Sequence, residues 1–313
     1  MSGNVVRFRP VAEGLVNLAF DNIYVTAADL DSRYRELENA FPDYVTSASL
    51  GMDAWGNDIR EYSFTAPQIT GDQSQYPAAA LDHPKICLAS GVHPFERPAI
   101  VATLLLFDDL CRRWQNDDML TQLRWGARLV VVPCVNPSGV NAGHTRRNGN
   151  NVDLNRNFPF EWDLVSDATK GPSAGSEAET QIMMGLAARH PDAVAFIDHH
   201  SHDNPGYPVW YGARNRSIGL VNRLLREHTA WMNREILFPN NGNHSRVAVS
   251  PSRSGMLASQ WQEVDNVTGF FLEGPMANQE QMIGISSLNQ RAMNVRALLH
   301  TLHGCWRHGL GLL

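Results

Sequence analysis

The sequence AVAFIDHHSH, residues 193–202, joins a short apolar run to an aspartate and three histidines. Short, continuous apolar runs are typical of strands that helices cover on both faces. KICLAS at 85–90 and RLVVVPCV at 128–135 have the same character, and GFFLE at 269–273 closes a further run. These segments therefore predict several neighbouring strands of one buried sheet.

Helical patterns separate the predicted strands. Apolar residues recur at spacings of three and four over 27–41, which predicts a helix capped by Asp29 or Asp31. Ser176 and Glu179 fit a capping box at the start of another helix. The other expected elements are two strands at 45–50 and 58–65 and helices at 98–114, 176–189, 220–231 and 286–303.

Strands that alternate with helices predict an α/β fold, with a mixed, mostly parallel, twisted β-sheet and helices on both of its faces. At roughly 150 residues per domain, a chain of 313 residues suggests two domains. The motifs described below interleave from residue 93 to residue 273, however, so a single domain is expected. Such sheets bind ligands at the carboxyl ends of their strands.

Composition excludes several classes of protein. Lys and Arg number 26 against 32 Asp and Glu, and the net charge of −6 lacks the basic footprint of a nucleic-acid binder. The longest apolar stretch, 99–107, is too short to cross a membrane. The N-terminus shows no signal peptide, and the four cysteines lie far apart without a CxxC pair, so a cytoplasmic location is expected.

Three of the apolar strands end in side chains that can bind a metal. KICLAS is followed by His93 and Glu96, AVAFID by the histidines of 199–202, and GFFL by Glu273. Catalytic zinc commonly takes two His and one Glu and leaves its fourth position for water. His93, Glu96 and one histidine of the 199–202 cluster therefore form a candidate zinc site.

The period of the strand narrows the choice of histidine. Successive side chains alternate between faces, so Asp198, His200 and His202 share one side and His199 points to the other. Asp198 is then placed to orient the imidazole of His200. We expect His199 to be packed or hydrogen-bonded on the far face. His202 lines the pocket, contacts substrate or holds a second metal.

The polar segment HTRRNGNNVDLNRNFPF, residues 144–160, brings three arginines and several asparagines together. A guanidinium is a planar fork that suits carboxylates and oxyanions. Arginines beside a zinc site therefore favour an anionic substrate.

The order of these motifs resembles that of the zinc carboxypeptidases of the M14 type, from about Tyr44 to the final helix. The matching segments are HPFE (93–96), NPSG (136–139), RRNGNNVDLNRNF (146–158), SEAET (176–180), HHSH (199–202) and FFLEGP (270–275). The resemblance implies a three-layer αβα fold and one Zn²⁺ per chain. It also divides the chain into an N-terminal helical extension, residues 1–43, and a catalytic domain, residues 44–313.

The resemblance also assigns roles to individual residues. It makes His93, Glu96 and His200 the metal ligands, in agreement with the zinc site expected above. Glu273 matches the catalytic carboxylate, which takes a proton from zinc-bound water and passes it to the leaving amine. The resemblance also implies the substrate contacts. Asn155 and Arg156 grip the terminal carboxylate, and Arg146 polarises the scissile carbonyl. Arg147 is the alternative to Arg146 if the alignment shifts by one residue.

One segment departs from the family pattern at a residue that concerns the substrate. Family members usually carry a tyrosine about twenty residues before the catalytic glutamate, whereas residues 248–261 here contain none. The pocket floor is expected within 250–265, where Met256 and Ala258 favour an apolar or small side chain, and Glu263 and Asp265 favour a basic one.

The expected function is hydrolysis of C-terminal amide bonds in small peptides or other small carboxylate-bearing substrates, with no nucleic-acid or membrane partner. The oligomeric state is left open. Two alternatives keep the zinc site and change the substrate: an amidase of murein-type peptides and a deacylase of N-acyl amino acids. A third is a non-catalytic binding protein on the same scaffold.

Overall fold

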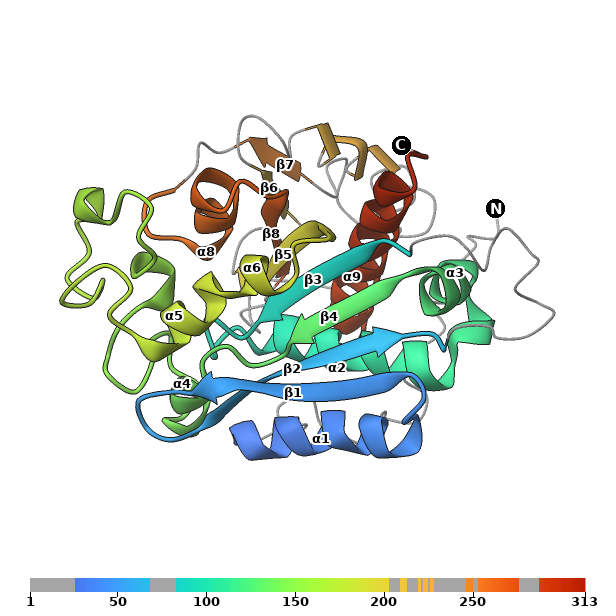
Figure 1. The fold of residues 1–313 in the computed structure, drawn as a ribbon, viewed down its shortest axis with the longest axis horizontal. Helices are drawn as coiled ribbons and strands as arrows, with labels where there is room; N and C mark the ends of the chain where they lie inside the picture. The colour runs from blue at the N-terminus through green and yellow to red at the C-terminus, as the bar shows by residue number, and fades with distance from the viewer. Residues whose placement is uncertain are drawn as a thin grey trace.

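The computed structural model describes residues 26–67, 83–202, 209–212, 219–220, 222–224, 226–227, 246–249, 253–275 and 287–312. Its centre is one twisted sheet (Figure 1). The strands are β1 (Val45–Met52), β2 (Asp58–Thr65), β3 (Lys85–Ser90), β4 (Arg128–Val132), β5 (Ala193–His202), β6 (Val209–Gly212), β7 (Arg246–Val249) and β8 (Gly269–Pro275).

The strand order is β1-β2-β4-β3-β5-β8-β6-β7. The central run β4-β3-β5-β8 is parallel throughout, and β6 pairs antiparallel with β8 and parallel with β7. β1 and β2 form an antiparallel hairpin that joins β4. The sheet is therefore mixed, with a parallel core, as the alternation of strands and helices predicts.

Helices cover both faces of the sheet (Figure 1). The α-helices are α1 (Ala27–Ala40), α2 (Arg97–Arg112), α3 (Asp118–Gly126), α4 (Pro137–Asn141), α5 (Ala178–Met184), α6 (Leu186–Arg189), α8 (Leu257–Ser259) and α9 (Ser287–Gly309). Short 3-10 turns lie at η4 (Trp114–Asn116), η5 (Leu154–Arg156) and η6 (Trp162–Leu164), and a π-helical turn at η7 (Gln260–Val264).

Two hydrophobic clusters separate the layers. One contains alternate residues of the central strands together with buried residues of α1, α2, α3 and α9. The other contains the intervening strand residues, such as Cys87 and Phe196, with residues of α5, α6, α8 and η7. Because adjacent strand residues belong to different clusters, the sheet is buried on both faces, which is the three-layer αβα arrangement.

Two expected caps are wrong. Thr26 caps α1, and Asp29 completes its capping box from the third helical position. At α5 no capping box forms, because Ser176 donates to the carboxylate of Glu177, which is the N-cap residue. Glu179 instead accepts a hydrogen bond from the Asn148 amide at 3.2 Å.

Other boundaries shift by a few residues. The helix expected over 176–189 is divided into α5 and α6 at Gly185. β5 extends four residues beyond the expected end, through His202, whereas β4 ends at Val132, three residues early. Within the expected helix 220–231, the described residues are helical, and the others, Trp231 included, lie outside the described residues.

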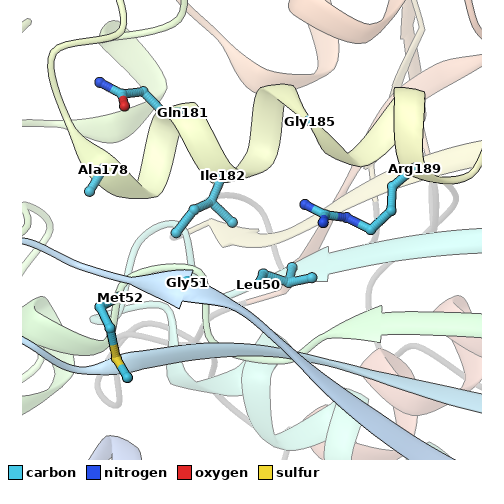
Figure 2. A pocket seen from close by; sticks show the side chains of 8 residues that line it. All are labelled: Leu50, Gly51, Met52, Ala178, Gln181, Ile182, Gly185 and Arg189. Atoms are coloured by element: carbon cyan, nitrogen blue, oxygen red, sulfur yellow. The ribbon is translucent and has the colours of Figure 1, made fainter.

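A hollow of about 370 Å³ lies between the edge strand β1 and the helices α5 and α6 (Figure 2). Leu50, Met52 and Ile182 give it an apolar lining, and the Arg189 side chain extends along it. None of the residues expected to form the functional site lines this hollow. In the part of the chain that the structure describes, no helix is long and apolar enough to cross a membrane.

Candidate metal centre

The loop between β3 and α2 carries the first two candidate ligands. Gly91 turns the chain at the end of β3 with a φ of +74°, a conformation that favours glycine. Arg97 begins α2, Pro98 lies in its first turn, and Glu96 occupies the N-cap position. His93 and Glu96 therefore project from a short, fixed connection at the carboxyl end of the sheet.

Three ligand atoms converge at this point. His93 Nδ1 lies 2.7 Å from Glu96 Oε1, and His200 Nδ1 lies 2.8 Å from Glu96 Oε2. One ligand atom from each of these residues lies within 4.8 Å of the others, and all three side chains are buried. The backbone N–H of Ser201 also donates to Glu96, at 2.9 Å. The structure thus brings together the three residues that the sequence offered as a zinc site.

The outer nitrogens of both imidazoles face carboxylates. His93 Nε2 lies 3.0 Å from Asp153 Oδ1, and His200 Nε2 lies 2.9 Å from Asp198 Oδ2. The Asn155 amide nitrogen is 3.0 Å from the same His200 atom. Metal-ligating histidines almost always present their second nitrogen to such partners, which fix the ring and its tautomer.

The charge of the centre follows from these contacts. Burial alone would raise the pKa of Glu96, but the imidazoles of His200 and His93 lower it well below its ordinary value. Burial likewise opposes ionisation of Asp153, whereas His93 and Arg146 lower its pKa below the usual range. Both carboxylates are therefore ionised at neutral pH, and the centre is suited to a cation.

Glu273 lies beside the cluster. It pairs with His200 in the parallel register between β8 and β5, so both side chains project from the same face. Its Oε2 is buried and has no hydrogen-bond partner among the described residues. Burial raises the pKa of Glu273 to about 7, against the opposing effect of His200, and a bound divalent cation would lower that value.

The two neighbouring loop arginines, Arg146 and Arg147, have different hydrogen-bond partners. Arg146 Nε donates to Asp153 Oδ2 at 2.8 Å, and its guanidinium lies 5.9 Å from the centre of the Phe95 ring. Arg147 donates to Asn151 within its own loop, at 3.0 Å, and both arginines are exposed. Arg146 thus lies two contacts from the cluster, through Asp153 and His93, whereas the Arg147 contact stays within its own loop.

Asn155 and Arg156 lie in η5, next to the segment that leads into α8. Asn155 is fully buried and accepts a hydrogen bond from the Leu257 N–H at 3.1 Å. Arg156 is half-buried, and its guanidinium donates to the Asn155 carbonyl at 2.7 Å. Gly255 packs so closely here that a Cβ would lie 2.7 Å from the Arg156 carbonyl oxygen.

His199 lies where strand alternation predicts. His199 points to the opposite face, where its Nδ1 is 2.9 Å from Thr103 Oγ1 of α2. Thr103 donates its own proton to the Ala99 carbonyl, so His199 is the donor in this pair. Burial lowers the pKa of His199 to about 3. His202, half-buried, ends β5.

Asp153 connects a candidate ligand, His93, to a candidate substrate contact, Arg146, a role that the sequence motifs do not assign to it. It is 1% exposed and lies between Val152 and Leu154, which are also buried. An acidic residue between two apolar ones was the available signal, because a buried carboxylate requires partners.

Comparison with known proteins supplies the family. The sequence profile of the zinc carboxypeptidase family, M14, matches residues 30–250. This chain belongs to that family. The match covers most of the chain and includes the candidate ligands His93, Glu96 and His200.

Two individual relatives share low sequence identity with this chain, over less than half of its length. Human carboxypeptidase D is 24% identical over 150 residues, which are 45% of this chain and 10% of that protein. Murein peptide amidase A of Escherichia coli K12 is 31% identical over 140 residues, 39% of this chain and 52% of that protein. The chain thus aligns with about a tenth of the first relative and about half of the second.

Solved structures share the fold. Carboxypeptidase A from Helicoverpa armigera superposes with a TM-score of 0.68 at 20% identity, over 93% of this chain and 74% of that one. At this identity the likeness concerns the arrangement of sheet and helices.

Proposed function

We propose that this chain is a zinc-dependent metallocarboxypeptidase that hydrolyses C-terminal amide bonds of small peptides. The observation that carries the proposal is the buried convergence of His93, Glu96 and His200 within 4.8 Å, with Glu273 on the same face beside His200. Family membership favours the same conclusion.

The residues present fit zinc. Two imidazole nitrogens and one carboxylate are the donor set of many catalytic zinc sites. His93 Nδ1, His200 Nδ1 and Glu96 would hold one ion per chain, while Asp153 and Asp198 keep the rings in place. When bound, zinc polarises a carbonyl and lowers the pKa of water toward roughly 7.

The chain's own residues supply the remaining steps. Glu273 takes the proton of the attacking water on its free Oε2 and passes it to the leaving amine. Arg146 donates to the oxyanion that develops on the scissile carbonyl. Asn155 and Arg156 hold the terminal carboxylate, so that only the last amide bond reaches the centre.

A second candidate retains this centre and takes murein-type peptides. The 31% identity to murein peptide amidase A is the observation that favours it. Those substrates also present carboxylates, so Arg156 serves both functions.

The test combines a substrate panel with one substitution. Zinc-loaded protein is given peptides with free C-termini, a murein tripeptide and N-acyl amino acids, and the products are identified by mass spectrometry. We expect a single C-terminal residue to be released from the peptides. Glu273→Gln should abolish this release while zinc stays bound. Near-normal rates in that variant would refute the assignment of Glu273, and exclusive cleavage of the murein tripeptide would favour the amidase.

A further inference from the structure

Three apolar side chains form a small cluster apart from the two main hydrophobic clusters: Met256, Ala258 and Phe271. We refer to them as the Phe271 cluster. They are only 7%, 2% and 6% exposed, in that order. The three side chains are therefore almost wholly shielded from solvent.

Phe271 places this cluster beside the candidate metal centre. It pairs with Asp198 in the register between β8 and β5 and lies two residues before Glu273, so it shares their face of the sheet. Its ring centre is 6.4 Å from that of His200, with the planes at 77°. One wall of the centre is thus an aromatic ring.

The other members approach from the side of the proposed carboxylate site. Leu257, between Met256 and Ala258, donates its backbone N–H to Asn155, whose amide nitrogen lies 3.0 Å from His200 Nε2. The Phe271 cluster therefore borders the same space as Asn155 and His200.

A substrate held as proposed above has its last residue in that space. Its terminal carboxylate would lie at Asn155 and Arg156, and its scissile carbonyl beside the residues that would hold the metal, His93, Glu96 and His200. The Cα of the terminal residue is then between the two, and its side chain meets the Phe271 cluster. Glu263, which favoured a basic terminal residue in the sequence, is exposed on η7 and does not belong to the Phe271 cluster.

We propose that Phe271 is a specificity-determining residue that fills the space for the terminal side chain and restricts the substrate to small residues such as glycine or alanine. This inference rests on the proposed carboxypeptidase function. Protein interiors are packed to crystal-like density, so a large side chain enters only by displacing the ring. One methylene in an apolar pocket changes kcat/KM by about tenfold or more.

The experiment measures kcat/KM on peptides that are identical except for a terminal Gly, Ala, Leu or Phe. For the wild-type protein we expect the values for Leu and Phe to be at least about tenfold below that for Ala. In Phe271→Ala the Leu-to-Ala ratio should rise by about tenfold or more, because the vacated volume accepts the larger side chain.

Phe270→Ala is the matched control. Phe270 is the neighbouring residue of β8, is fully buried, and belongs to the cluster on the opposite face of the sheet. Phe270→Ala removes the same ring as Phe271→Ala, so a change in specificity that reflects general destabilisation of the fold would appear in both variants. Zinc content and thermal unfolding are measured for each, and Phe271→Val replaces Phe271→Ala if the latter does not fold.

The outcomes separate the two proposals. No release from any peptide by zinc-loaded wild-type protein refutes the proposed function, and this inference with it. Release with a preference for terminal Leu or Phe refutes the role of Phe271 alone, as does an unchanged ranking in Phe271→Ala. A change of ranking in Phe271→Ala but not in Phe270→Ala, with zinc retained in both, supports it.

Discussion

At the scale of single residues, the neighbours Arg146 and Arg147 differ in their partners. The Arg146 guanidinium is tied to Asp153, a buried carboxylate that also contacts His93. The Arg147 guanidinium contacts only Asn151 among the hydrogen bonds of the described residues. Both guanidiniums are exposed, so the difference between them lies in the contact with Asp153, which presets the Arg146 donor beside the candidate centre.

We therefore expect Arg146→Gln to lower kcat by about 100-fold or more, in line with the loss of one oxyanion donor. Arg147→Gln is the control with the same change of charge and should keep kcat within about threefold of wild type. Steady-state kinetics on a peptide ending in alanine provides the measurement. Equal losses in both variants would contradict the assignment.

Much of the site can be predicted from residue types at strand ends. His93, Glu96 and Glu273 follow apolar runs, and strand alternation separates His200 from His199. The role of Asp153 could not be predicted, and the choice of Arg146 over Arg147 came only from the family resemblance, because both depend on a loop whose conformation is set by contacts distant in sequence. Phe95, for example, donates its backbone N–H to the Thr145 carbonyl.

At the scale of elements, the apolar strands and long helices were predictable and their ends were not. Thr26 caps α1 because its side chain reaches the Asp29 N–H, a contact that Asp29 itself cannot make. The capping box expected at Ser176 is absent because Asn157 and Glu177 occupy its hydroxyl. The contacts of Ser176 with its neighbour Glu177 and with Asn157, nineteen residues earlier, thus override the local signal.

Glu179, in the first turn of α5, supplies a prediction about pH. It is 1% exposed, its Oε2 has no partner among the described residues, and Asp53 and Glu177 lie nearby. Burial is the main cause that raises its pKa, and those two charges add to the rise. A raised native pKa means that the folded protein holds this proton more tightly than the unfolded chain does. Its contribution to stability is complete below pH 4.5 and declines as the pH rises through the native value.

We expect Glu179→Gln to flatten this dependence. Between pH 4.5 and 8, the free energy of unfolding should fall less in the variant than in the wild type. The difference between the two falls should be about 1.4 kcal/mol for each unit by which the native pKa of Glu179 is raised. Urea unfolding at several pH values measures the difference. Glu36→Gln, a change at an exposed residue of α1, should keep the wild-type slope. Parallel curves for wild type and Glu179→Gln would contradict the prediction.

At the scale of the whole molecule, the candidate centre joins segments that are far apart in the chain. His93 and Glu96 come from the loop between β3 and α2, and His200 comes from β5, about a hundred residues later. β3 and β5 are adjacent parallel strands, so their carboxyl ends meet at one edge of the sheet. A metal at this point would link the central strands to the start of α2.

Removal of zinc should therefore destabilise the whole domain. An ion that binds only the folded state adds about 4 kcal/mol when its free concentration is 1,000 times Kd. For a chain of this size we expect a chelator to lower Tm by roughly 10 °C. Added zinc should restore Tm, whereas magnesium should not, because it prefers oxygen ligands to imidazole. His93→Ala is the control: it should show a low Tm that neither chelator nor zinc changes. An equal Tm with and without zinc in the wild-type protein would show that the buried cluster does not hold the ion. The reason is that the fold brings two imidazoles and one carboxylate together, and a cation bound between them stabilises the folded state.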